Sequence, residues 1–163
     1  MALSTLQWRR QGGHHRPIQG GRSLNLTGSA ANNVLVGGAG TDRLIGGQGR
    51  DILIGGSGLS TLNAGSGGDI LIGGTTSYDG NAAALAAILA EWSRTDIDYA
   101  TRIAHLTGSS SGGLNGTFFL NASTVQADGM VNKLYGGAGL DWYFAGLADL
   151  LFNHVVGEVI TQV

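Results

Sequence analysis

Acidic side chains recur at a fixed spacing in the stretch VGGAGTDRLIGGQGRDILIGG, residues 36–56. Its two successive nonapeptides, GGAGTDRLI and GGQGRDILI, share glycines at positions one, two and four, an Asp at position six and an apolar tail. One carboxylate per nine residues, always beside a Gly-rich turn, can supply hard oxygen ligands to a metal ion. The chain has no Cys, which excludes thiolate metal sites and disulfides.

The nonapeptide frame extends beyond this stretch. Counted in nines from Gly28, five tandem units run to Ile72, and two more follow at residues 127–144. Position eight of the five tandem units is always leucine: Leu35, Leu44, Leu53, Leu62 and Leu71. A low-complexity linker has no reason to keep Leu at this position, so the 30 Gly and 1 Pro of the chain indicate a folded repeat rather than disorder.

Each half of the unit has a different structural task. Glycines permit positive φ and close backbone approach, so the first six residues are expected to form a tight turn. The last three residues alternate as a short strand, with position eight pointing inward. Two units then make one coil, and stacked coils make a parallel β-solenoid. Adjacent Asp-bearing turns repel each other, and Ca²⁺, which takes about 6–8 oxygen ligands in a flexible geometry, is the divalent cation that best relieves this repulsion.

The units resemble the GGxGxDxUx repeats of the RTX (repeats-in-toxin, haemolysin-type) calcium-binding family. The resemblance covers roughly residues 28–74 and 127–144. It implies a calcium β-roll, export from a bacterium by a type I secretion system without an N-terminal signal peptide, and folding only outside the cell. The predicted fold class is therefore mainly β: a parallel β-roll or β-solenoid with calcium-binding turns and a two-helix insertion packed on one face.

The predicted metal site comprises the position-six side chains and the turns that carry them. Alternate turns lie on the same edge, so one edge holds Asn33, Asp51 and Asp69, and the other holds Asp42 and Ser60. The site between Asp51 and Asp69, with two carboxylates, is expected to be the strongest. The full set of predicted metal-site residues is Asn33, Gly37, Gly40, Asp42, Gly46, Gly49, Asp51, Gly55, Gly58, Ser60, Gly67, Asp69, Asn132, Gly136, Gly139 and Asp141.

Residues 75–126 interrupt the repeats with a different kind of sequence. The segment 81–92, NAAALAAILAEW, is rich in strong helix formers, and residues 96–106 place apolar side chains on one face. Both segments are therefore expected to be helices. A flexible Gly/Ser loop follows, and TFFL at 117–120 is predicted to be a strand.

The predicted helices have an apolar surface to cover. On the face formed by the first, third and fifth units, the outward strand positions are all aliphatic: Val34, Val36, Ile52, Ile54, Ile70 and Ile72. A stripe of this size should not stay in contact with water, so the helix at 81–92 is expected to pack on it. A subunit interface is the alternative.

The two ends of the sequence have their own character. Residues 1–22 form a basic arm without acidic residues, and residues 23–163 are expected to form a single domain. The C-terminal segment 145–163 is similar to uncleaved type I export signals, with an ordinary final strand pair as the alternative. A formal net charge of −2 argues against binding to nucleic acid, and the lack of an 18-residue apolar run predicts no membrane span.

Other motifs that could carry chemistry are weaker. GSSSG at 108–112 matches the GxSxG nucleophile elbow, but it follows a predicted helix instead of a strand. His14 and His15 have no third ligand at helical spacing, while His105 and His154 are isolated, as packing or surface residues often are. No catalytic residue is predicted, and the protein is expected not to be an enzyme.

These features predict a secreted, extracellular structural protein that folds on binding Ca²⁺. The ends of a solenoid expose unpaired backbone groups, so head-to-tail self-assembly into a homo-oligomer or filament is expected. The basic arm would lie on a neighbouring copy or, equally, fold back on its own roll. The alternative function is a C-terminal folding and type I export module of a larger exoprotein or adhesin.

Overall fold

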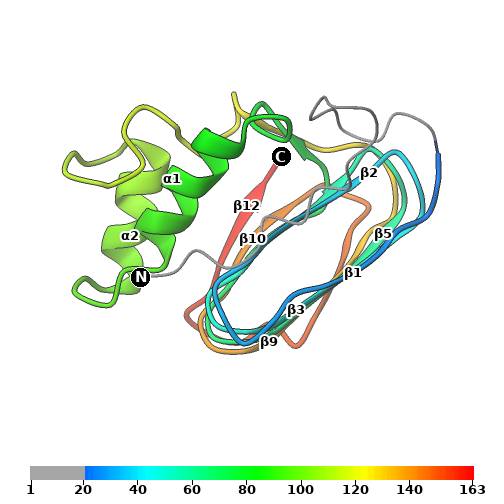
Figure 1. The fold of residues 1–163 in the computed structure, drawn as a ribbon, viewed down its shortest axis with the longest axis horizontal. Helices are drawn as coiled ribbons and strands as arrows, with labels where there is room; N and C mark the ends of the chain where they lie inside the picture. Colours follow the sequence, from blue (N-terminus) through cyan, green and yellow to red (C-terminus); the bar gives the residue numbers. More distant parts are fainter. Residues whose placement is uncertain (1–20) are drawn as a thin grey trace.

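The computed structural model describes residues 21–163, so predictions for the first twenty residues of the arm lie outside the described residues. The described chain is mainly β, with two five-stranded parallel sheets, a short antiparallel pair and two helices (Figure 1). The first sheet contains, in order, β1 (Asn25–Thr27), β3 (Asp42–Gln48), β5 (Ser60–Ser66), β9 (Lys133–Ala138) and β11 (Leu150–Phe152). The second contains β12 (Val159–Gln162), β10 (Trp142–Ala145), β6 (Ile70–Ile72), β4 (Ile52–Gly56) and β2 (Val34–Gly38).

Strands that follow one another along the repeats lie in opposite sheets, as the nonapeptide pattern predicts. Within a sheet, parallel neighbours are offset by two units, so that Leu53 pairs with Leu71. The sheets continue in the same register after the insertion, because Leu71 pairs with Tyr143 and Leu62 pairs with Leu134. Equivalent positions of the repeat therefore stack in columns.

The inward side chains at position eight fill the space between the sheets, which confirms their predicted direction. The buried cluster there contains Leu35, Leu44, Leu53, Leu62, Ala64, Leu71, Leu134, Tyr143 and Ala145. Full burial of one Leu side chain contributes about 1.5–3 kcal/mol. The stacked leucines are thus the main apolar contact that joins the two sheets.

The insertion forms two helices, α1 (Ala82–Trp92) and α2 (Tyr99–Thr107). The side chains of Asn81 and Asp98 accept hydrogen bonds from backbone N–H groups of the first turns, which caps both helices. Gly108 ends α2 with a left-handed φ of 83°, a conformation that glycine adopts without steric cost.

The helices cover the outer face of the second sheet, as Figure 1 shows. One buried cluster joins the outward aliphatic side chains of β2, β4 and β6 to Leu85, Ile88, Leu89 and Trp92 of α1. Val36 packs at the margin of this cluster. The predicted packing of this helix on the aliphatic stripe is confirmed, so the stripe does not need a second subunit to cover it.

The segment 117–120, predicted to be a strand, is not one. Leu120 is buried in the outer cluster, and the Asn115 side chain donates a hydrogen bond to the carbonyl of Phe118, which holds the segment as an irregular turn. The insertion instead closes through β7 (Thr75–Thr76) and β8 (Val125–Gln126), an antiparallel pair that brings its two ends together. The chain therefore leaves the sheets and returns to them at one place.

Candidate metal centre

The position-six side chains stack in two columns at opposite edges of the sheets. The first column contains Asn33, Asp51, Asp69 and Asp141, each of which directly precedes a strand of the second sheet. The second column contains Asp42 and Ser60, the first residues of β3 and β5, and Asn132, which directly precedes β9. All seven side chains are buried, with exposed fractions of 0–2%. The predicted division of the first five units between two edges agrees with this arrangement.

A ladder of hydrogen bonds runs along the first column. The backbone N–H of Asn33 donates to Asp51 Oδ1, that of Asp51 to Asp69 Oδ1, and that of Asp69 to Asp141 Oδ1, each at 2.7 Å. The last of these bonds spans 72 residues of sequence, because the insertion lies between the two turns. Each Asp therefore uses one carboxylate oxygen to bind the turn of the preceding coil.

The second column repeats the pattern with fewer carboxylates. The N–H of Leu24 donates to Asp42 Oδ1 at 2.8 Å, and the N–H of Ser60 donates to Asn132 Oδ1 at 2.8 Å. The N–H of Asn132 in turn donates to Asp149 Oδ1 at 2.9 Å. This edge holds less negative charge at position six than the first.

Asp149 and Glu158 complete the two columns, and sequence reasoning missed both. Glu158 Oε1 accepts from the N–H of Asp141 at 3.2 Å, as Asp149 does from Asn132. Each of these two residues lies 17 positions after its partner, one fewer than the 18 of the regular coil. A search that allowed one deleted residue in the last turns would have found them.

The second oxygens of the column carboxylates distinguish two kinds of turn. Oδ2 of Asp42, Asp51, Asp69 and Asp141 is buried and has no hydrogen-bond partner within the described chain. In contrast, Asp149 Oδ2 accepts from the N–H of Gly146 at 2.8 Å, and Glu158 Oε2 accepts from that of Val155 at 2.7 Å. The last coil is satisfied by hydrogen bonds, whereas the regular turns leave a buried acceptor without a donor, which is costly.

The position-one glycines show what surrounds these unpartnered oxygens. A Cβ at Gly37 would lie closer than 3.0 Å to both Asp42 Oδ2 and the carbonyl oxygen of Gly55. A Cβ at Gly46 would lie equally close to Asp51 Oδ2 and the carbonyl oxygen of Ala64. We call the space beside each of these glycines a cradle. In each cradle a carboxylate oxygen and a carbonyl oxygen from successive coils converge. A cation would stabilise such a pair, and hard oxygen ligands suit Ca²⁺, so the residues present fit this ion.

The position-four glycines serve the stacking of the turns. A Cβ at any of them would meet backbone atoms of the preceding coil at or below 3.0 Å, as at Gly58 against the carbonyl of Gly40. This group comprises Gly40, Gly49, Gly58, Gly67 and Gly139. Their small size allows the close approach that places carbonyl groups of neighbouring turns next to the columns.

Burial dominates the electrostatics of the first column. It raises the pKa of Asp51 to about 6 and that of Asp141 to about 6. Burial, together with the nearby carboxylates of Asp141 and Asp51, raises the pKa of Asp69 to about 8. Both effects disfavour the charged carboxylates, and a bound cation would counter both.

Among residues 21–163, no group of three or more His, Cys, Asp or Glu side chains is placed to hold a metal ion. The cradles depend instead on one carboxylate per turn and on main-chain carbonyl groups. Such a site suits an oxygen-binding cation of flexible coordination better than Zn²⁺, which is bound mainly by His and Cys side chains.

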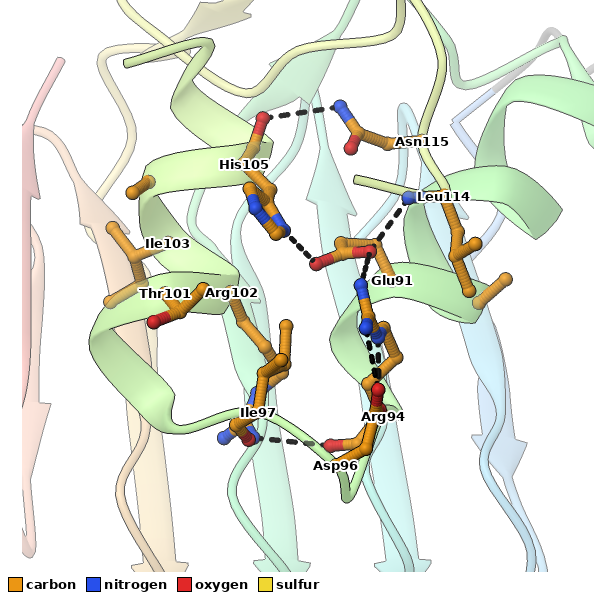
Figure 2. A network of polar contacts seen from close by, with 12 residues as sticks. Glu91, Arg94, Asp96, Ile97, Thr101, Arg102, Ile103, His105, Leu114 and Asn115 are labelled. Carbon is orange, nitrogen blue, oxygen red and sulfur yellow. Dashed lines mark hydrogen bonds and ion pairs between the residues drawn. The ribbon is translucent and has the colours of Figure 1, made fainter. Parts of the chain in front are cut away.

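The helices hold several other titratable residues in one polar network (Figure 2). His105 Nδ1 lies 2.6 Å from Glu91 Oε1, and Glu91 Oε2 accepts from the N–H of Leu114 at 2.7 Å. Arg94 Nε donates to Asp96 Oδ1 at 2.9 Å. The network joins α1, α2 and the loop that follows, so His105 has a packing environment between two helices.

The remaining sequence candidates have separate surroundings. His14 and His15 lie outside the described residues. The N–H of Ser110 donates to the carbonyl of Ala104 at 3.1 Å, and the His154 ring contacts Tyr143 edge-on, with centroids 6.0 Å apart. Neither helix of the described residues has the length and apolar character that a membrane span requires.

Comparison with known families agrees with this geometry. A family model described as the RTX calcium-binding nonapeptide repeat (4 copies) matches residues 25–53, 45–75 and 131–149. The chain carries RTX calcium-binding nonapeptide repeats, and these repeats indicate a calcium-binding protein of the RTX type. The matched segments contain every position-six residue of both columns and Asp149, whereas Glu158 lies outside them. Comparisons with curated proteins and with solved structures gave no match.

Proposed function

We propose that the chain is a calcium-dependent β-roll with a structural role outside the cell. The observation that carries the proposal is the pair of cradles at Gly37 and Gly46, where carboxylate and carbonyl oxygens of successive coils converge without a donor. The alternation of strands between the two sheets supports the β-roll, since each coil then contributes one turn to each column.

The oxygen atoms of the cradles indicate how the ion would be held and what it would stabilise. Asp42 and Asp51 would hold Ca²⁺ through Oδ2, with the carbonyl oxygens of Gly55 and Ala64 opposite them. Bound Ca²⁺ supplies positive charge between oxygen atoms that otherwise repel one another. Because these oxygens belong to successive coils, ion binding and coil stacking stabilise each other.

Calcium is expected to be required for the fold. Glycine loses more conformational entropy on folding than other residues, so Gly-rich turns are costly to order. In addition, the buried carboxylates oppose the stacking of the turns when no cation is present. Circular dichroism in chelator should show a largely unfolded chain, and a β signal should appear at about 10⁻⁴–10⁻³ M calcium, the range of extracellular calcium modules. Mg²⁺ is the matched control, since it demands stricter octahedral geometry. A full β signal in chelator would contradict the proposal.

The proposed location is extracellular and the proposed role is not catalytic. RTX repeats are linked to type I secretion, and a chain that folds only at about 10⁻⁴–10⁻³ M calcium would stay unfolded during export. The network around His105 supports a packing role for this residue. Secretion is tested in a bacterial host that carries a type I system: the chain should appear in the medium, and deletion of residues 145–163 should retain it in the cells.

Head-to-tail self-assembly is part of the proposal. β1 and β2 form one end of the described sheets, and β11 and β12 form the other, so each end presents unpaired strand edges. The second end also exposes Leu147 (93%) and Val156 (100%). A second copy that stacks its first coil there would extend both sheets. Light scattering with calcium should show oligomers that deletion of residues 1–22 reduces; a full-length protein that stays monomeric at high concentration would exclude assembly.

The alternative is a C-terminal folding and export module of a larger exoprotein. The two ends of the ladder differ in a way that favours it. The carboxylates of Asp149 and Glu158 have hydrogen bonds at every oxygen. Within residues 21–163, Asn33 Oδ1 accepts only from the Ser29 hydroxyl, at 3.4 Å. The N-terminal end could thus receive a further coil from a preceding segment. Fusing an unrelated passenger before residue 1 tests this function, because a module should export the passenger in the host with the type I system.

A further inference from the structure

Tyr143 breaks the pattern of the inner core. Position eight is Leu in the five tandem units and at Leu134, but the last unit places a tyrosine there. Its side chain is 0% exposed and lies among the inner leucines. Its hydroxyl is buried and has no hydrogen-bond partner within the described chain. A buried phenol normally finds a partner, so this hydroxyl requires an explanation.

The hydroxyl lies in the cradle of the Asp141 turn. A Cβ at Gly136 would be closer than 3.0 Å to both Tyr143 Oη and Asp141 Oδ2. In the equivalent cradle at Gly46, the atom opposite the Asp51 carboxylate is the carbonyl oxygen of Ala64. A carbonyl can only accept a hydrogen bond, whereas a phenol, with an ordinary pKa of about 10, is protonated at neutral pH and can donate one.

We propose that the Tyr143 hydroxyl, which makes no hydrogen bond in the structure, turns to donate to Asp141 Oδ2 and takes the place of the cation in this turn. The first column would then change at Asp141 from turns joined by Ca²⁺ to a turn joined by a hydrogen bond. The proposal rests on the proposed function, because it sets the limit of the calcium-binding column.

The other polar groups of Asp141 support this assignment. Its Oδ1 accepts from Asp69, its N–H donates to Glu158, and its carbonyl accepts from the Tyr99 hydroxyl at 2.6 Å. Oδ2 is thus the one side-chain oxygen of Asp141 that lacks a partner. A donor from Tyr143 would complete the turn, in keeping with the neighbouring last coil, where hydrogen bonds satisfy the carboxylates of Asp149 and Glu158.

Bound calcium per chain, measured by equilibrium dialysis at saturation, tests the proposal. Asp141→Asn and Tyr143→Phe should each leave the number of bound ions unchanged, whereas Asp51→Asn should raise the calcium concentration at half-saturation about tenfold. Tyr143→Phe, which keeps the ring in the core, should also lower the Tm of the calcium-bound protein by about 3–10 °C through the lost hydrogen bond to a carboxylate. Tyr135→Phe is the matched control and should not change the Tm, because Tyr135 stacks on Phe152 outside the inner cluster.

Each other outcome has a defined meaning. A loss of one ion in Tyr143→Phe or Asp141→Asn would show that a cation occupies this turn and would overturn the proposal. An unchanged Tm in Tyr143→Phe would also overturn it. If the wild-type chain binds no calcium, the proposed function fails instead. If Asp141→Asn does not fold, Tyr143→Phe alone decides between these outcomes.

Discussion

The two oxygens of a position-six Asp have different tasks in this chain. Oδ1 of Asp51 binds the N–H of the preceding coil, and Oδ2 faces a carbonyl group of the following coil. An Asp-to-Asn change keeps an oxygen for the ladder but removes the negative charge from the cradle. The calcium contribution of a turn can therefore be separated from its hydrogen bond.

The two columns should respond differently to this change. Asp51→Asn should raise the calcium concentration at half-saturation about tenfold and Asp42→Asn about threefold, because charge count tunes calcium affinity and Asp51 has the Asp69 carboxylate as a neighbour whereas Asp42 has Ser60. Calcium titrations followed by circular dichroism measure both shifts. Equal shifts would mean that the first column is not the stronger one.

Ala64 provides a second test at the residue scale. It stands at position one of the Asp69 unit, where the other four tandem units have glycine, and it is fully buried. Because a Cβ at the equivalent Gly37 and Gly46 would crowd the cradle oxygens, Ala64→Gly should open the Asp69 cradle and lower the calcium concentration at half-saturation about threefold. Ala39→Gly, at an exposed position three, is the control and should not change it. Weaker binding by Ala64→Gly would refute the expectation.

At the scale of elements, the helical insertion is joined to the turns of the first column. Trp92 Nε1–H donates to the carbonyl of Gly68 at 2.9 Å, beside Asp69, and the Tyr99 hydroxyl donates to the carbonyl of Asp141 at 2.6 Å. Arg50, in the Asp51 turn, donates to the carbonyl of Arg94 at 2.5 Å, just after α1. The insertion is thus held by polar contacts at the edge as well as by the aliphatic stripe.

Ile88→Asp should separate the helices from the sheet. Ile88 is 0% exposed in the outer cluster, so an unpaired charge there should lower the free energy of unfolding of the calcium-bound protein by about 3–5 kcal/mol. Ala83→Asp, at an exposed site in the first turn of α1, is the matched control and should change it little. Urea unfolding with saturating calcium gives both values, and an unchanged stability of Ile88→Asp would refute the packing.

At the scale of the whole molecule, calcium binding should appear as compaction. A folded chain of 163 residues has a radius of gyration of about 15 Å, and an unfolded chain of this length about 43 Å. Small-angle X-ray scattering at low protein concentration should give the smaller value with calcium and a value near the larger one in chelator. A compact chain in chelator would show that hydrophobic burial alone holds the coils together.

Much of this architecture follows from the nonapeptide alone, because the repeat contains its own contacts. Leu at position eight has one buried direction in a strand, and a regular spacing of two units aligns every Asp with the next. Three features could therefore be predicted: the edge that holds Asp51 and Asp69, the inward direction of the leucines, and the helix that covers the aliphatic stripe. Errors occurred where no periodicity existed, as at 117–120, whose side chains pack from an irregular turn.

Only the tertiary structure decided how the columns end. The β7–β8 pair returns the chain to the place where it left, so Asp141 joins Asp69 across 72 residues, a relation that no local spacing encodes. Because the last turns are one residue shorter, Asp149 and Glu158 lie at the ends of the columns but outside the nonapeptide frame. The sequence by itself determined the regular coils, because stacking repeats one local geometry. Their termination depends on which distant groups meet there, and the packing of the complete chain decides that.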